Sequence, residues 1–201
     1  PAWRLKFGLL ASALVTVLLM ITSLALVDWF DSSVTVRMNG ISITFKGKSG
    51  LWKSCREVTV VPDTPALPSS SECGLYSEGN VGATFRTARA FALLAVIMTA
   101  AAVMWTVLLE TFCKSMKEKT IGLLAPRLLF TAGGLFMLIS AFSFLGVRFT
   151  FTDTVLQLTV ELAEKYGAGY GVAWVSIIVC TVTAVLAHFH HGSIETTADT
   201  K

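Results

Sequence analysis

The sequence has few charged residues, and four long stretches have none. Charged residues make up 14% of the 201 positions, whereas a soluble domain carries about a quarter. No Asp, Glu, Lys, Arg or His occurs in Phe7–Val27, Ala90–Leu109, Leu128–Val147 or Gly171–Ala187. A helix needs roughly 20 apolar residues to cross the hydrocarbon core of a bilayer. These stretches exclude an ordinary soluble domain and predict four membrane spans, at about 7–27, 90–109, 128–147 and 168–188.

The sequence also lacks the residue groupings that chemistry requires. The uncharged stretches of the predicted spans hold no Asp, Glu, Lys, Arg or His, which argues against an ion or proton pathway through a single copy. One cluster has metal-ligand residue types, His188, His190 and His191 at the end of the fourth span. A polar cap on that helix end is the simpler interpretation. We therefore expect no enzyme, no catalytic residue, no cofactor and no metal site.

Positive charge gathers on one side of the predicted spans. The basic residues before the first span and in the loop at 111–127 are Arg4, Lys6, Lys114, Lys117, Lys119 and Arg127, against one acid, Glu118. Short cytoplasmic loops are enriched in Lys and Arg. Both termini are therefore predicted in the cytoplasm, with the loops at about 28–89 and 148–167 outside the cell. The predicted topology accounts for the net charge of +3, because the excess basic residues lie in the cytoplasmic segments. We therefore expect no nucleic-acid partner.

The first span could alternatively be a secretory signal, because Arg4 and Lys6 precede it. It is 21 residues long and ends in Asp28-Trp29, whereas the apolar part of a signal has about 7–15 residues and a small-residue cleavage site. We therefore predict that it stays in the membrane.

The longer outer loop has the pattern of a small β-structure. Two runs that alternate apolar with polar residues, 34–38 and 41–45, flank Asn39-Gly40. Asn-Gly between such runs indicates a tight hairpin, because both turn residues accept positive φ. Leu51–Val61 predicts a third strand and Cys73–Tyr76 a short fourth. In the second outer loop the alternation of Val147, Phe149 and Phe151 predicts one more strand of the same sheet.

A sheet of this size needs a covalent tether or a surface to pack on. Cys55 and Cys73 lie in the outer loop, where oxidising conditions preserve disulfides, so we predict that they pair; two free thiols are the alternative. Closing this loop would contribute about 3 kcal/mol, mostly by restricting the unfolded chain. Cys113, on the cytoplasmic side, is expected to be a reduced thiol, with palmitoylation as the alternative. Cys180 is expected to pack inside the fourth span.

Several of these residues form a signature. Trp29 is followed by Gly50-Leu51-Trp52, then by Cys55 and Cys73, and Arg89 precedes the second span. This order resembles the signature of the claudin superfamily, which includes claudins, peripheral myelin protein relatives, and the regulatory subunits of AMPA receptors and calcium channels. The resemblance implies one claudin-like domain over residues 1–201, an all-α membrane four-helix bundle that carries a small extracellular antiparallel β-sheet.

The signature residues also have a physical interpretation as architecture. Trp29 and Trp52 are expected where the sheet meets the membrane, with their rings in an apolar layer and their indole N–H groups in water. Gly50 would let the backbone approach closely beside them. Arg89 is expected to reach back to the outer loop or to a lipid headgroup.

Two features depart from the claudin pattern. Cys55 and Cys73 are 18 positions apart, farther than in claudins, because a proline-rich stretch separates them. In this stretch Pro62, Pro65 and Pro68 favour an extended excursion, which we interpret as a partner contact or a tolerated insertion. Phe149 and Phe151 are a second candidate partner contact. They lack the proline of the claudin adhesion turn, which argues against head-to-head adhesion of the claudin kind.

The resemblance leaves three functions open. A junction protein would associate with other copies at cell–cell contacts of the plasma membrane and form a paracellular barrier or pore. An auxiliary subunit would pack against an ion channel of the AMPA-receptor or calcium-channel kind, and a myelin-type organiser would share the same fold. Expected partners are membrane lipids and either other copies or a larger membrane protein such as a channel. We favour the junction protein. Residues 29–88 hold six basic and five acidic residues, which predicts no strong ion selectivity.

Overall fold

The computed structural model describes residues 2–38, 41–61, 70–75, 82–111, 120–145, 150–153, 158–161 and 163–198, without the side chains of 2–6, 38, 41, 110, 120–123, 150–164 and 190–198. Its four helices are α1 (Ala2–Ala25), α2 (Ala83–Thr111), α3 (Thr120–Leu145) and α4 (Ala168–Ala198). Each is long and apolar enough to cross a membrane. The prediction of four candidate membrane spans is thereby confirmed, and the helices are those of a multi-pass membrane protein.

The helices extend beyond the uncharged stretches. The second begins at Ala83 rather than Ala90, so Arg89 lies within its first two turns. The third begins at Thr120 and includes Pro126 as its seventh residue, so one backbone hydrogen bond of the helix is missing there. Helical hydrogen bonds continue past the apolar layer, so a lack of charge marks the membrane-facing part of each helix rather than its ends.

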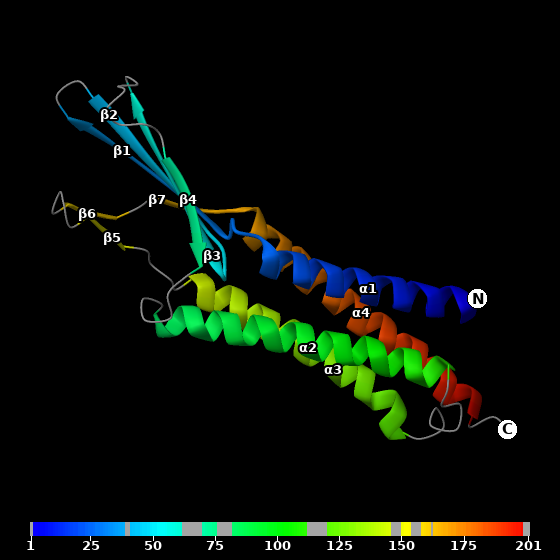
Figure 1. The fold of residues 1–201 in the computed structure, drawn as a ribbon. Helices are drawn as coiled ribbons and strands as arrows, with labels where there is room; N and C mark the ends of the chain where they lie inside the picture. The colour runs from blue at the N-terminus through cyan, green and yellow to red at the C-terminus, as the bar shows by residue number, and fades with distance from the viewer. Residues whose placement is uncertain are drawn as a thin grey trace.

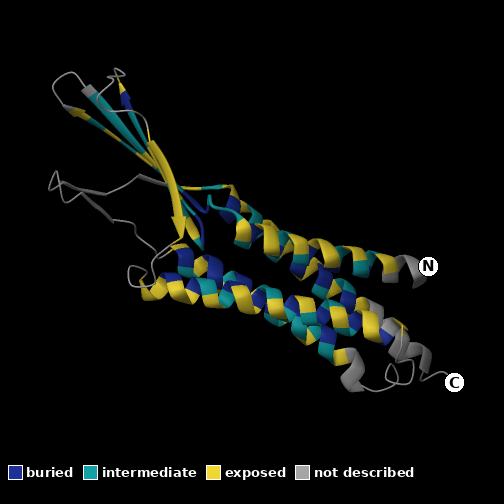
Figure 2. Ribbon diagram, in the orientation of Figure 1, coloured by how far each residue is buried: buried dark blue, intermediate teal, exposed yellow. Residues whose placement is uncertain are grey.

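The helices form a bundle whose neighbours run antiparallel, with the sheet at one end (Figure 1). Helix α1 begins and α4 ends at the opposite end of the bundle. Buried residues occur where the helices face one another, while many residues on their outer surfaces are exposed (Figure 2). Apolar side chains such as Leu18, Ile97 and Ile178 make up these outer surfaces. An apolar exterior of this kind suits contact with lipid.

Two adjacent glycines at the helix contacts yield the first testable prediction. A Cβ atom at Gly133 would clash with the Thr99 hydroxyl and lie 3.3 Å from the Ala95 carbonyl oxygen, whereas one at Gly134 would lie 3.6 Å from the Cys180 sulfur. We expect Gly133→Ala to cost about 1–3 kcal/mol through overpacking, and Gly134→Ala to be nearly neutral. Thermal unfolding in detergent micelles measures both. Equal effects of the two alanines would contradict the close approach of α2 and α3.

The sheet has five antiparallel strands in the order β4-β3-β2-β1-β7. Their bounds are β1 Phe30–Met38, β2 Ile41–Ser49, β3 Lys53–Val61, β4 Ser70–Leu75 and β7 Ala163–Tyr166. Four strands therefore come from the first outer loop, as predicted. Met38 pairs with Ile41, which fits a two-residue turn, although Asn39-Gly40 lies outside the described residues. Tyr76, predicted to end the fourth strand, also lies outside them.

The prediction for the second outer loop was wrong in its position. The strand that joins the sheet is β7, not the run that contains Phe151. Of that run, Val147 and Phe149 lie outside the described residues, and Phe151 lies in β5 (Thr150–Asp153), which pairs with β6 (Leu158–Glu161) in a separate two-stranded sheet. The reason is position along the chain: β7 directly precedes α4, whose first residues are hydrogen-bonded beside the start of β1.

The five-stranded sheet has one apolar and one polar face. Residues two apart on a strand share a face, and the register places apolar residues of β1, β2 and β3 in common rows. These residues are Val34, Val36, Ile43, Phe45, Val58 and Val60, all half-buried or buried. The opposite face carries a row of threonines, in which the Thr35 and Thr44 hydroxyls are hydrogen-bonded at 3.1 Å. The alternation of apolar and polar residues in the sequence therefore produces the same two faces on β1, β2 and β3.

Candidate functional site

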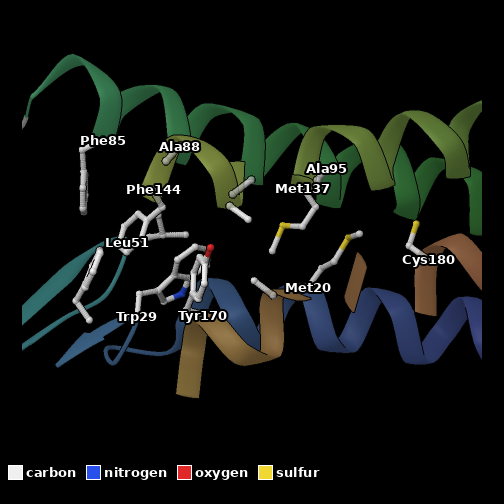
Figure 3. Close-up of a cluster of buried hydrophobic side chains, with 14 residues drawn as sticks. Met20, Trp29, Leu51, Phe85, Ala88, Ala95, Met137, Phe144, Tyr170 and Cys180 are labelled. Carbon is white, nitrogen blue, oxygen red and sulfur yellow. The ribbon is translucent and has the colours of Figure 1, made fainter. Parts of the chain in front are cut away.

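The sheet meets the bundle in a cluster of buried side chains from all four helices and from the sheet (Figure 3). We call the part of this cluster made by Trp29, Phe30, Leu51, Phe85, Phe144 and Tyr170 the junction. The ring of Phe144 lies at its centre, with ring centroids 4.7 Å from Trp29 and 4.8 Å from Phe30. Aromatic pairs at such distances contribute about 0.5–1.5 kcal/mol beyond burial. The junction therefore fixes the sheet on the helices.

Trp29 is buried more deeply than the sequence suggested. Its side chain is 0% exposed, and its indole N–H donates to the carbonyl oxygen of Ser23 at 2.7 Å. The expectation of an indole N–H in water was therefore wrong for Trp29. The cause lies in α1, which ends at Ala25, because carbonyls in the last turn of a helix lack intrahelical donors. The indole supplies one, so Trp29 acts as a cap for α1 as well as a packing residue.

Gly167, directly before α4, and Gly169, in its first turn, bind the backbone at Asp28 and Trp29. The Gly167 N–H donates to the carbonyl oxygen of Trp29 at 2.9 Å, and the Gly169 N–H donates to that of Asp28 at 3.0 Å. A Cβ atom at Gly169 would lie only 2.6 Å from Cδ1 of Trp29. The sequence analysis did not predict these two hydrogen bonds. The signal was present as a Gly-x-Gly pair directly before an apolar helix.

Gly50 lies between β2 and β3, where the sheet touches the end of α1. A Cβ atom there would overlap the Leu26 carbonyl oxygen and lie 2.7 Å from Cα of Val27. Only glycine fits such a contact without moving the backbone. The next residue, Leu51, is fully buried in the junction. The Gly-Leu pair of the signature therefore combines a backbone contact with a buried side chain.

Arg89 links α2 to the same turn of the sheet. Its Nε–H donates to the carbonyl oxygen of Leu51. The guanidinium carbon lies 5.1 Å from the ring centroid of Trp52 and 4.7 Å from that of Phe85, within the range of cation–π attraction. Of the two expected targets, Arg89 thus reaches the outer loop. Trp52 is half-buried beside it.

The predicted disulfide is present. Cys55 on β3 and Cys73 on β4 stand directly opposite each other and are joined at 2.06 Å. All residues of β4 are exposed, so little burial holds this edge strand, which is attached by its pairing with β3 and by the disulfide. Cys180 is buried, as expected, and its thiol donates to the carbonyl oxygen of Phe130 at 3.3 Å. Cys113 lies outside the described residues.

Charge on the sheet is separated by face. The register places five exposed basic residues on the polar face. They are Arg37, Lys46, Lys48, Lys53 and Lys165, and the acidic residues of that face are Glu57 and the half-buried Asp31. Asp31 pairs with Lys48 on one side and Lys165 on the other. The near balance counted along the first outer loop therefore conceals a positive face.

Some candidate residues cannot be placed. Pro62, Pro65, Pro68 and Phe149 lie outside the described residues, and of Phe151 only the backbone, in β5, is described. Their role as partner contacts stays a prediction. Within the described ranges, no three His, Cys, Asp or Glu side chains are grouped so that they could hold a metal ion.

The arrangement suits a protein that binds a partner through the surface of its sheet. The junction residues are occupied in holding the sheet, and the faces and edges of the sheet are what a partner would meet. The sequence matches no known family model, and a comparison with curated proteins also found no match.

Proposed function

We propose that this chain is a claudin-like protein of the plasma membrane that associates with further copies at cell–cell contacts and limits or selects the passage of ions between cells. The main support is the combination of four apolar helices with a disulfide-tethered sheet fixed at one end of the bundle. In this proposal both termini are cytoplasmic and the sheet is extracellular. The disulfide fits that side, because disulfides persist in oxidising compartments.

The buried cluster around Trp29, which we named the junction, supports this proposal because it holds the sheet rigidly on the helices. Trp29 is hydrogen-bonded to both α1 and the start of α4, and Arg89 connects α2 to the turn before β3. A sheet held at several points keeps its orientation to the membrane. A surface that is already ordered before association loses less conformational entropy when it binds. Side-by-side assembly in a membrane would use that fixed orientation, because each copy would present the same edge to its neighbour.

The charge of the polar face gives this proposal a measurable consequence. If this face lines the path between cells, its basic residues favour anions. We expect Lys46→Glu with Lys48→Glu to shift permeability toward cations by about twofold or more, since a unit charge about 8 Å away in water contributes roughly 0.5 kcal/mol. Dilution potentials across epithelial monolayers measure the shift. Lys117→Glu, in the predicted cytoplasmic loop, is the control, and an equal shift there would contradict the assignment of the face.

An auxiliary channel subunit is the second candidate function. It is favoured by the hairpin of β5 and β6, which is separate from the five-stranded sheet and would suit contact with a large extracellular domain. The long proline-containing insertion supports it too. In this function the outer helix surfaces would pack against channel helices.

Expression in cells that lack junctions separates the two functions. The junction protein is expected to concentrate at contacts between two expressing cells, and to be depleted at contacts with a non-expressing neighbour. Native purification from a tissue source is the second arm. If the protein is distributed evenly over the cell surface and a channel co-purifies with it, the proposal of a cell–cell junction protein is wrong and the auxiliary-subunit function takes its place.

A further inference from the structure

One edge of the five-stranded sheet is only partly covered. Strand β7 pairs with the first residues of β1, from Phe30 opposite Tyr166 to Ser33 opposite Ala163. Beyond Ser33, residues 34–38 of β1 have β2 on one side and, among the described strands, no partner on the other. Alternate residues of such an edge direct their backbone N–H and C=O groups outward. An open strand edge of this length is a template for another strand.

The segment just before β7 matches this edge in register. Strand β6 ends at Glu161, one residue before β7 begins. If the pairing of β7 with β1 continued without a break, Glu161 would stand opposite Thr35, Val160 opposite Val36 and Leu158 opposite Met38. No residue would have to be inserted or removed. Strand β6 therefore has the length and the position in the chain that the free edge requires.

The side-chain pattern matches the faces as well. Tyr166 lies beside Phe30 in the register, so even-numbered residues of a continued strand would share the face of Phe30. Val160 would then stand opposite Val36 and Leu158 opposite Met38, so the register would pair apolar with apolar residues. Thr159 would stand opposite Arg37 and Glu161 would be diagonal to Arg37, a favourable register position for opposite charges. A shift by one residue would exchange the faces and lose this match.

Strand β6 can make this pairing without giving up its present one. It pairs with β5 along one edge, with Phe151 opposite Val160, and an antiparallel strand has two edges. The hairpin of β5 and β6 could therefore join the sheet as a unit. A two-stranded hairpin on its own is marginally stable in water. Joining the sheet would therefore stabilise the hairpin and would also pair the open edge of β1.

We propose that the outer edge of β1, residues 34–38, is a strand-addition site whose occupant is β6 of the same chain. Docking of β6 extends the five-stranded sheet by the hairpin, and its release leaves an edge that a strand of a partner can take. The same chain is the favoured source because β6 is one residue from a strand already paired to β1, which gives it a high effective concentration. Either function proposed above is compatible with both arrangements.

Cysteine pairs test the register directly. In a chain with Cys113→Ser and Cys180→Ala, the pair Thr35→Cys and Glu161→Cys is expected to form an intrachain disulfide under mild oxidation in native membranes. The control pair Val36→Cys and Glu161→Cys places the two thiols on opposite faces and is expected to react at least about tenfold more slowly, because the Cβ vectors point apart. Mass spectrometry of unreduced peptides measures both. Equal rates for the two pairs overturn the proposal, and so does a bond that forms only between chains.

Hydrogen exchange provides an independent measurement on the chain without added cysteines. The outward amides of residues 34–38 are expected to exchange slowly and to lose most of this protection in Val160→Pro, since proline cannot contribute its N–H to a ladder. Exchange in β3 is the internal control and is expected to stay unchanged. If Val160→Pro leaves exchange at residues 34–38 unaltered, β6 does not occupy this edge.

Discussion

Trp29→Ala is expected to lower the free energy of unfolding by about 3–5 kcal/mol, the range for removing a large buried aromatic side chain. The indole is fully buried in the junction beside Phe144 and caps α1 through its bond to Ser23. Its loss leaves a cavity against Phe144 and a carbonyl without a donor. Thermal unfolding in micelles measures the stability, and surface biotinylation is expected to show a matching loss of delivery to the cell surface.

Trp52 provides a matched control, because it belongs to the same signature but is only half-buried. Trp52→Ala is expected to cost clearly less than Trp29→Ala. Trp29→Phe separates packing from hydrogen bonding, since it keeps a ring but removes the N–H donor, and an intermediate loss is expected. Equal losses for the two alanine variants would mean that the junction is not the main attachment of the sheet.

Cys55→Ser is the second change with a large expected effect, a destabilisation of about 2–5 kcal/mol. Because every residue of β4 is exposed, burial compensates little for the lost bond. The expected results are a changed mobility without reducing agent, a lower unfolding temperature and reduced surface delivery. Hydrogen exchange in β4 is expected to rise most.

Non-additivity is the control for this interpretation. Cys55 and Cys73 act through one bond, so the variant with both replaced by serine is expected to be no less stable than either single variant. A loss in the double variant that equals the sum of the two single losses would show that the cysteines act separately. Unaltered mobility of Cys55→Ser would contradict the disulfide itself.

The spans and the first hairpin could be predicted because their signals are local. Stretches without charge mark the apolar part of each helix, and the alternation around Asn39-Gly40 marks β1 and β2. The disulfide was also predictable, because two cysteines shared one outer loop. In each case the relevant physics acts between neighbouring residues or within a single compartment.

The junction could be predicted only in part. Trp29 was singled out, yet its hydrogen bond to Ser23 depends on where α1 ends. That end is decided by tertiary contacts, which a residue pattern does not contain. The roles of Gly167 and Gly169 depend on backbone atoms far away in the sequence. For the same reason, the alternation at Phe151 predicted a strand correctly but gave no information about its partner.

The separation of charge by face was hidden for a related reason. A count of charges along the first outer loop mixes residues from both sides of the sheet. Only the strand register shows that Lys46, Lys48 and Lys53 share a face, and that Lys165 from the other loop joins them. A pleated strand alternates its faces with every residue, so a one-dimensional sum loses this information.

The hydrogen bond between Trp29 and Gly167 also has a consequence for the order of events during synthesis. The start of β1 leaves the ribosome early, but β7 and the start of α4, which pack and pair against it, belong to the last quarter of the chain. Until α4 is inserted, the indole of Trp29 lacks its cover and the edge of Phe30 lacks β7. The sheet is therefore completed only after β7 and the start of α4 have been made. A chain truncated after residue 150 should stay in the endoplasmic reticulum, and its arrival at the cell surface would contradict this checkpoint.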